Sequence, residues 1–157
     1  MSDDWKEKLA KATGYEGSNF DKSKRKREGG ERSMQIRFYS DVKNKVMSHD
    51  LLDEQAHRVA KKLAHKLKST QLRKFHNHIR ELEAKIELEG EENFRKKMLP
   101  LVKMVKSKVA YACPKKVPYE FRNLMESMIN QIDDKKDFET FSLCFEAIVG
   151  YFYGEGG

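Results

Sequence analysis

Cysteine, proline and glycine are all scarce in this sequence. It contains 2 Cys, 3 Pro and 9 Gly in 157 residues. Cys113 and Cys144 have neither the density of a disulfide framework nor the spacing of a zinc site, so we expect reduced thiols and a cytoplasmic protein. Because residues that break helices are few, while Lys, Glu, Leu and Met are abundant, the composition favours helices.

Long hydrophobic runs and catalytic motifs are also missing. No apolar run approaches the roughly 20 residues of a membrane span, and the first residues lack the apolar core of a signal peptide, so we expect no membrane partner. The sequence has no glycine-rich phosphate loop, Gly-x-Ser-x-Gly elbow or kinase signature. We therefore expect a protein that is not an enzyme and that needs no cofactor.

Histidine is the one residue type that could suggest a metal site or acid–base catalysis. Five histidines lie between His49 and His78, but no His-x-x-x-His pair occurs. On a helix, His76 and His78 would point to different faces, which suits neither a metal site nor a catalytic pair. We therefore predict no metal site, and a small ribonuclease that uses His65, His76 or His78 is only an alternative hypothesis.

Positive charge dominates the sequence and is unevenly distributed. The formal net charge is +7 and the pI is about 9.3. Residues 34–80 hold 11 Lys and Arg against 4 Asp and Glu, whereas residues 119–157 hold 3 against 8. This polarity suits a protein that places one side against a polyanion and another side against protein.

The pattern predicts an all-α fold, with a single compact bundle of about five helices at residues 34–153. Residues 1–33 contain four glycines and a basic run at 22–27, and we interpret them as a flexible basic arm. That arm would bind nucleic acid, act as a localisation-like patch or be only a solvated tail. Residues 154–157 are interpreted as a short C-terminal tail.

Apolar residues at helical spacing place the five helices. The expected ranges are 50–67, 70–89, 94–112, 118–132 and 138–153. The short link after the first helix predicts that the first two pack side by side in an antiparallel or steeply angled hairpin. Pro100 either kinks the third helix or begins a new one. The last helix is apolar over much of its circumference, so it should be central to the bundle or lie in an interface. Residues 34–38 alternate like a strand but have no evident partner, so we expect them to be extended or irregular.

Basic residues form the strongest functional signal. No acidic residue occurs between Arg58 and Arg80, and on two consecutive helices such a run predicts a surface that binds phosphates with little base specificity. A merely solvated face is the alternative. Asn77 and Tyr111 would add sugar or base contacts or be ordinary residues at the core edge. The candidate RNA-binding residues are Arg58, Lys62, Lys66, Lys68, Arg73, Lys74, Arg80, Lys103 and Lys106.

Three segments resemble the small subunit of type III-A CRISPR effector (Csm) complexes. They are Ser-Thr-Gln-Leu-Arg-Lys-Phe-His-Asn at 69–77, Lys-Val-Ala-Tyr-Ala at 108–112 and Phe-Glu-Ala-Ile-Val-Gly-Tyr-Phe at 145–152. They occur in the order found in that family, and the resemblance extends over residues 51–153. Because Arg73 and Lys74 lie within the first segment, the resemblance makes them the strongest candidates for RNA contact.

The resemblance implies a non-catalytic helical subunit that stacks in several copies beside the RAMP-type backbone subunit. Its implied partners are crRNA and target RNA, bound without sequence specificity, together with other Csm subunits. Self-association would occur by stacking or as a homodimer, while RNA cutting, DNA cutting and cyclic-oligoadenylate synthesis would belong to other subunits. A general helical adaptor whose positive charge is incidental is the main alternative.

The sequence departs from the family pattern at two places within that resemblance. His76 stands where the family usually has an aromatic residue, commonly Tyr. After Ala112 the family often reaches an arginine through a small residue, whereas Cys-Pro-Lys-Lys follows here at 113–116. A lysine there can supply the charge but not the two-pronged phosphate contact of arginine. The arm at 1–33 also looks longer than the family requires.

Overall fold

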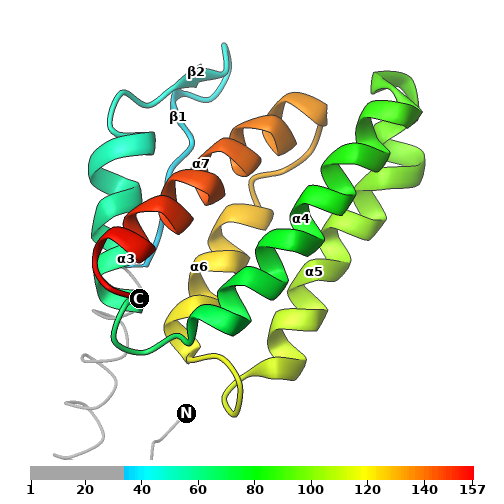
Figure 1. Ribbon diagram of the computed structural model, residues 1–157. Coiled ribbons are helices and arrows are strands. Elements are labelled where there is room, and N and C mark those ends of the chain that lie inside the picture. Colours follow the sequence, from blue (N-terminus) through cyan, green and yellow to red (C-terminus); the bar gives the residue numbers. More distant parts are fainter. Residues whose placement is uncertain (1–33) are drawn as a thin grey trace, which may run out of the picture. The chain divides into compact units, whose positions relative to one another are not determined.

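The computed structural model describes residues 34–157, and these residues form an all-α bundle (Figure 1). The basic arm expected at residues 1–33 lies outside the described residues. The five α-helices of the described part are α3 (Ala56–Leu63), α4 (Ser69–Glu89), α5 (Leu99–Ala112), α6 (Tyr119–Ile129) and α7 (Lys135–Gly154). Shorter elements are strands β1 (Tyr39–Asp41) and β2 (Val46–Met47), which pair antiparallel, the π-helical turns η1 (Leu51–Gln55) and η3 (Phe94–Met98), and the 3₁₀ turn η2 (Glu91–Asn93).

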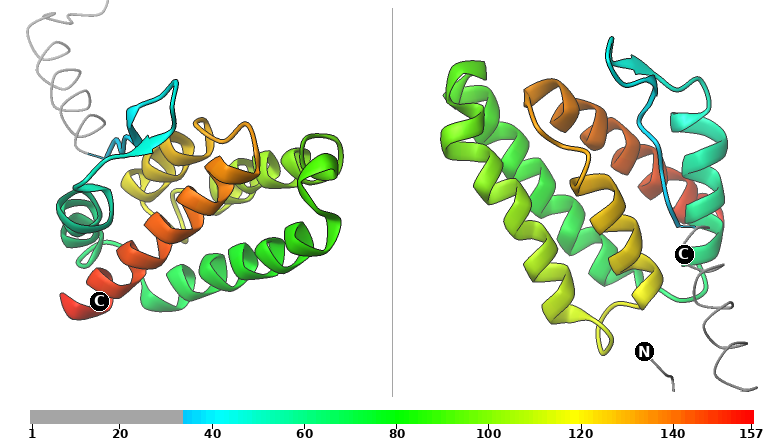
Figure 2. Two further views of the ribbon diagram at one scale, coloured as in Figure 1. Left: turned by 90° about the horizontal axis from the view of Figure 1, so that it is seen from above. Right: turned by 180° about the vertical axis from the view of Figure 1, so that it is seen from behind.

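Helix α7 is central to the bundle. It packs against α3 and η1 on one side and against α4 on the other, and the views from the front and from above both show it between them (Figures 1 and 2). The expected side-by-side packing of the first two helices is therefore wrong, because α7 lies between α3 and α4. The apolar surface of α7, which includes the fully buried Phe141, Phe145 and Phe152, has to be covered from both sides, and α3 and α4 separate to cover it.

Helix α4 follows its sequence pattern closely. Its buried side chains are the five at helical spacing, namely Leu72, Phe75, Ile79, Leu82 and Ile86. Burying each of these large apolar side chains contributes about 1.5–3 kcal/mol. The helix ends at Gly90, whose positive φ of 74° suits a residue without a side chain. Because these five side chains point into the core, they determine which residues of α4 face outwards.

Helix α5 begins rather than bends at Pro100. The π-helical turn η3 precedes it, and Pro100 occupies its first turn, where the missing N–H costs no helical hydrogen bond. The first predicted helix differs more, because it starts as the π-helical turn η1 and ends at Leu63 instead of continuing to Leu67. Leu67 is still buried, but in the turn that leads into α4. Seen from behind, α6 lies beside α5 (Figure 2).

The segment before β1 alternates buried and exposed side chains and is extended, as its sequence predicts. Its backbone pairs with glutamine side chains rather than with another strand. Gln131 accepts a hydrogen bond from the Phe38 N–H (3.0 Å) and donates to the Ile36 carbonyl (2.6 Å). Gln55 meets the Arg37 N–H from the opposite side (3.0 Å). Two side-chain amides therefore replace the neighbouring strand that the sequence lacks.

The β1–β2 hairpin is tied to the first turn of α7. Tyr39 donates its hydroxyl proton to Asp137 (2.6 Å), and Lys45 forms ion pairs with Asp134 and Asp137. Burial alone would raise the pKa of Asp137, but the hydrogen bonds from Tyr39 and the Asp133 N–H, together with Lys45, hold it below its ordinary value. Asp134 also caps α7 in a capping box with Asp137.

The last four residues close α7. The Gly157 N–H donates to the Phe152 carbonyl (3.0 Å) and the Gly156 N–H to the Tyr153 carbonyl (3.1 Å), while Gly156 has a φ of 84°. This is a Schellman motif, in which a left-handed glycine satisfies the final helical carbonyls. Among the described helices, none combines the length and the apolar character that crossing a membrane requires.

Candidate nucleic-acid interface

Helix α4 presents a row of cationic side chains to solvent. Because Leu72 and Phe75 point into the core, Arg73, Lys74 and Arg80 lie outwards and are exposed. We call these three residues the α4 cationic face. None of them forms an ion pair with an acidic side chain of residues 34–157. Within residues 34–157, no acidic side chain neutralises these three charges, so they can bind an anion.

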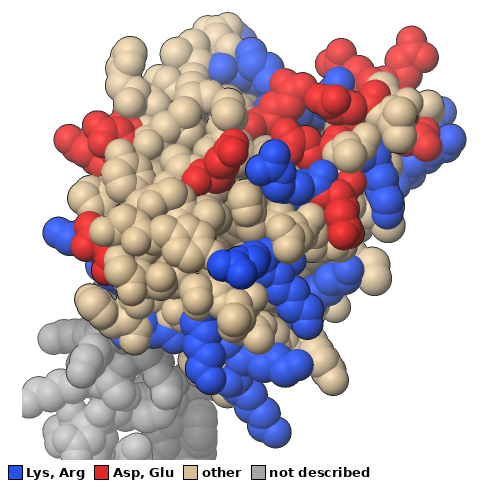
Figure 3. Space-filling model, viewed as in Figure 1, with Lys and Arg blue, Asp and Glu red and all other residues tan. Residues whose placement is uncertain are grey.

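The charges along α4 oppose the helix dipole. A helix is stabilised by acidic residues in its first turn and basic residues in its last turn, and α4 has neither. Arg73 and Lys74 lie in its N-terminal half and Arg80 lies near its middle, while Glu81, Glu83, Glu87 and Glu89 follow toward its C-terminal end. Lys and Arg gather where α4 begins and α5 ends, and acidic side chains toward the other end of α4 (Figure 3). Cations thus precede the acidic residues along α4, which is the reverse of the order that stabilises a helix.

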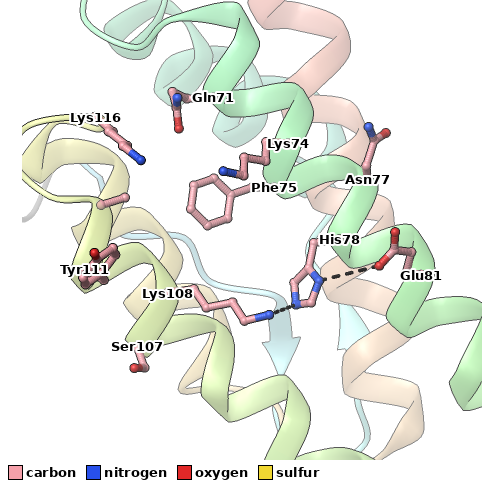
Figure 4. A pocket seen from close by; sticks show the side chains of 11 residues that line it. Gln71, Lys74, Phe75, Asn77, His78, Glu81, Ser107, Lys108, Tyr111 and Lys116 are labelled. Carbon is pink, nitrogen blue, oxygen red and sulfur yellow. Dashed lines mark hydrogen bonds and ion pairs between the residues drawn. The ribbon is translucent and has the colours of Figure 1, made fainter.

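A cleft of about 650 Å³ lies between α4 and α5. We call it the α4–α5 cleft. Phe75 forms part of its apolar lining, and the side chains of Gln71 and Lys74 from α4 and Lys116 from beyond α5 point toward the space in front of that ring (Figure 4). Tyr111 lies on the α5 side and is 90% exposed. The remaining lining residues are Asn77, His78, Glu81, Ser107, Lys108 and Ala112.

A lysine and a histidine meet across this cleft. The Lys108 ammonium lies 3.2 Å from Nε2 of His78, and Nδ1 of the same ring lies 3.9 Å from a carboxylate oxygen of Glu81. The partial burial of His78 and the nearby charge of Lys108 lower the pKa of the imidazole. The ring is therefore neutral at pH 7, with Nε2 accepting from Lys108.

Four of the predicted RNA-binding residues make contacts within the bundle. Lys66 pairs with Glu120 (2.6 Å), and Arg58 donates to the Gln35 carbonyl (3.0 Å). Lys103 donates to the Ile129 carbonyl and Lys106 to the Asn130 side chain, both at 2.7 Å. Both lysines belong to α5, and their ammonium groups reach the C-terminal end of α6, where cations stabilise a helix. Burial and the neighbouring charge of Lys106 lower the pKa of Lys103.

The remaining predicted residues are exposed but not all together. Lys62 lies on α3, and Lys68 is the residue immediately before α4. The structure therefore brings Lys68 close to the α4 cationic face, leaves Arg58 and Lys62 on α3, and places Lys103 and Lys106 at the end of α6.

The histidines do not form a catalytic pair. His76 faces α7, with its ring 6.0 Å from that of Phe145, whereas His78 faces α5. His65 is exposed beyond the end of α3. Within residues 34–157, no three His, Cys, Asp or Glu side chains come together as metal ligands would. The ribonuclease hypothesis thus has no supporting geometry in this part of the chain.

The family model for Csm2 Type III-A matches residues 46–156. The chain belongs to this family. No curated protein and no solved structure matches it. As a member of the Csm2 family, it is a small subunit of a type III-A CRISPR complex and associates with other Csm subunits. The matched segment contains the five α-helices of residues 34–157, so both walls of the α4–α5 cleft lie within it.

Family membership gives the departures in sequence a structural setting. His76 is half-buried and packs against α7, so its ring does not line the α4–α5 cleft. Lys116 follows the 108–112 segment, and its side chain lines the cleft. A positive charge after this segment therefore faces the cleft.

Sequence reasoning did not place Gln71 or Lys108 among the candidate site residues, although both line the cleft. One signal for Lys108 was present, because Lys108 and Tyr111 are three positions apart on α5 and both are exposed. What the sequence did not show is that this side of α5 faces α4, which requires the packing of two helices about 30 residues apart.

Proposed function

We infer that this Csm2 family member is a non-catalytic subunit that contacts the sugar–phosphate backbone of crRNA and target RNA. The observation that supports this proposal is the α4 cationic face, which is exposed and has no acidic partner within residues 34–157. Cations of this kind bind phosphates regardless of base sequence. Exposed Lys68 and Lys62, with Arg58 and Lys66, would extend the contact toward α3.

The assembly follows from the same proposal. The chain would stack in several copies beside the RAMP-type backbone subunit in the cytoplasm, and in isolation it would pair with itself as a homodimer. The acidic C-terminal part of the sequence offers a side of opposite charge for protein contacts. Lys103 and Lys106 donate hydrogen bonds to residues at the end of α6. They would contribute to RNA binding only through the long-range electrostatic attraction of their positive charges.

The direct test is RNA binding by an Arg73→Ala/Lys74→Ala variant. Single-stranded RNA should bind the unmodified chain in a salt-sensitive manner, with a log–log slope that falls by about 0.7 for each phosphate contact removed. The matched control is Lys96→Ala/Lys97→Ala, which removes the same charge from η3, beyond the opposite end of α4. Equal binding by both variants at every salt concentration would reject the α4 cationic face as the contact.

Copurification separates this function from the adaptor alternative. A small subunit of the effector complex should retain other Csm proteins and a crRNA of defined length when it is isolated from cells that express the complex. A general adaptor should retain neither. The Arg73→Ala/Lys74→Ala variant is expected to assemble with the Csm proteins, because both side chains are exposed and outside the core.

A further inference from the structure

The α4–α5 cleft has a composition that a simple phosphate-binding surface does not need. Three ammonium groups, those of Lys74, Lys108 and Lys116, line the same space as two aromatic rings, those of Phe75 and Tyr111. Phosphates require only the cations. The rings instead suit a flat apolar group that carries negative charge beside it, and a nucleotide has this chemistry.

Tyr111 is the most unusual residue of the cleft. Its side chain is 90% exposed, although a tyrosine normally covers part of its ring against the protein. Phe75, in contrast, is 8% exposed and packs against Phe121 with its ring centroid at 5.3 Å. The cleft therefore combines a fixed aromatic surface with an uncovered aromatic side chain on the α5 side (Figure 4).

The size and charge of the cleft fit one nucleotide. Its volume of about 650 Å³ lies within the range of roughly 300–1,000 Å³ that is typical of small-ligand sites. Glu81 is the one acidic residue among its lining residues, and it lies beside His78. Gln71 adds an amide that can both donate and accept a hydrogen bond, as the edge of a base requires.

We propose that the α4–α5 cleft accepts one unstacked base of a single-stranded RNA segment. The inference rests on the proposed function, and it adds a base-binding site to the phosphate contacts. Lys74 connects the two, because it belongs to the α4 cationic face and also lines the cleft. A strand whose phosphates lie along Arg73 and Lys74 can turn one base toward Phe75 and Tyr111. A base within a duplex stays stacked and does not reach the cleft.

Tyr111 offers a test that leaves the fold intact, since its side chain is solvent-exposed. Binding of a short uridine homopolymer RNA is measured by fluorescence anisotropy over a range of salt concentrations. Tyr111→Ala should weaken binding by about tenfold, as expected for one lost base–aromatic contact, without changing the salt slope. Tyr111→Phe should bind as the unmodified chain does. The matched control is Tyr119→Ala, which removes another exposed tyrosine outside the cleft.

Two further probes define the ligand. An RNA of the same length that lacks its bases should bind the unmodified chain and Tyr111→Ala equally. Uridine monophosphate alone, measured by calorimetry, should bind far more weakly than the strand. Tight binding of the free nucleotide would instead identify a mononucleotide site and overturn the proposal for an RNA base.

The outcomes separate this inference from the function on which it rests. If Arg73→Ala/Lys74→Ala loses salt-sensitive RNA binding while Tyr111→Ala binds as tightly as the unmodified chain, the base site is rejected and the phosphate contact stands. If the unmodified chain binds no RNA, both are rejected. If Tyr111→Ala loses affinity for RNA that carries bases, while Tyr119→Ala does not and RNA without bases binds equally, the base site is supported.

Discussion

Lys108 on α5 and His78 on α4 meet across the α4–α5 cleft, with Nζ 3.2 Å from Nε2 (Figure 4). The contact requires a neutral imidazole, because a protonated ring has no lone pair to accept from an ammonium group. Two residues 30 positions apart in sequence thereby link the walls of the cleft and make its geometry sensitive to pH.

We expect the free energy of unfolding to fall as the pH decreases from about 7 to about 5. Burial and Lys108 lower the pKa of His78 below its ordinary value of 6.5, and burial and Arg80 do the same for His76. On acidification the two histidines of the unfolded chain therefore take up protons before those of the folded chain. The contribution of the neutral histidines to the free energy of unfolding is fully present above pH 6.5, and it is lost as the pH falls through their lowered pKa values.

The measurement is urea unfolding across that pH range. His76→Gln/His78→Gln should show a flatter dependence than the unmodified chain. Asn77→Ala, which lies on the same helix and removes no titrating group, should keep the original dependence. If the double variant and the control lose stability equally on acidification, the histidines are not responsible.

Gln131 should be sensitive to substitution, because its side chain pairs with the backbone of residues 36–38. In Gln131→Ala the Phe38 N–H and the Ile36 carbonyl lose their partners, and each unsatisfied group costs about 1–3 kcal/mol when it is buried. We expect a loss of about 2 kcal/mol in the free energy of unfolding, measured with denaturant. Asn130→Ala, which changes the preceding exposed amide, should cost about 0.5 kcal/mol or less. Equal losses would show that the glutamine does not replace a strand.

The local parts of this fold were predictable, and the parts that depend on distant contacts were not. The seam of α4 was predicted because the positions of Leu72 and Ile79 follow from helical spacing alone. The central position of α7 followed from its apolar circumference. The separation of α3 from α4, however, results from what each helix covers, and no local pattern encodes it. The pairing of Gln131 with Ile36 and Phe38 depends on contacts across more than 90 positions.

The candidate site divides in the same way. Arg73 and Lys74 were predicted because neighbouring residues on one helix fix their direction. Lys103 was predicted from its charge alone, whereas its contact with the Ile129 carbonyl depends on where α6 ends. The cleft itself needed the structure, since its two walls come from separate helices.

Two glycines, one within α7 and one just beyond its end, should respond in opposite directions to alanine. Gly150 lies within the helix, and a Cβ there would meet nothing within 4 Å, so Gly150→Ala should stabilise the isolated chain by up to about 1 kcal/mol. Gly156 has a φ of 84° in the Schellman motif, so Gly156→Ala should destabilise it by about 1 kcal/mol. Thermal unfolding compares the two. A stabilising Gly156→Ala would contradict the motif.

Substitutions of Lys68 should test whether the start of α4 favours RNA binding at the expense of helix stability. It occupies the N-cap position of α4 with an extended backbone (φ −75°, ψ 136°) but makes no capping hydrogen bond. Aspartate in that position would cap the helix and complement its dipole, so Lys68→Asp should raise the free energy of unfolding by about 1 kcal/mol.

The same substitution should weaken binding of single-stranded RNA, because it replaces a cation next to the α4 cationic face with an anion. Lys68→Asn separates the two effects: it should keep most of the added stability, since asparagine also caps helices, and it should lose less RNA affinity than Lys68→Asp. Denaturant unfolding and anisotropy titrations at fixed salt measure both quantities on the same samples. If Lys68→Asp gains stability and binds RNA as tightly as the unmodified chain, the contact does not extend to the start of α4. In that case the lysine at position 68, where aspartate gives a more stable chain, would need an explanation other than RNA binding.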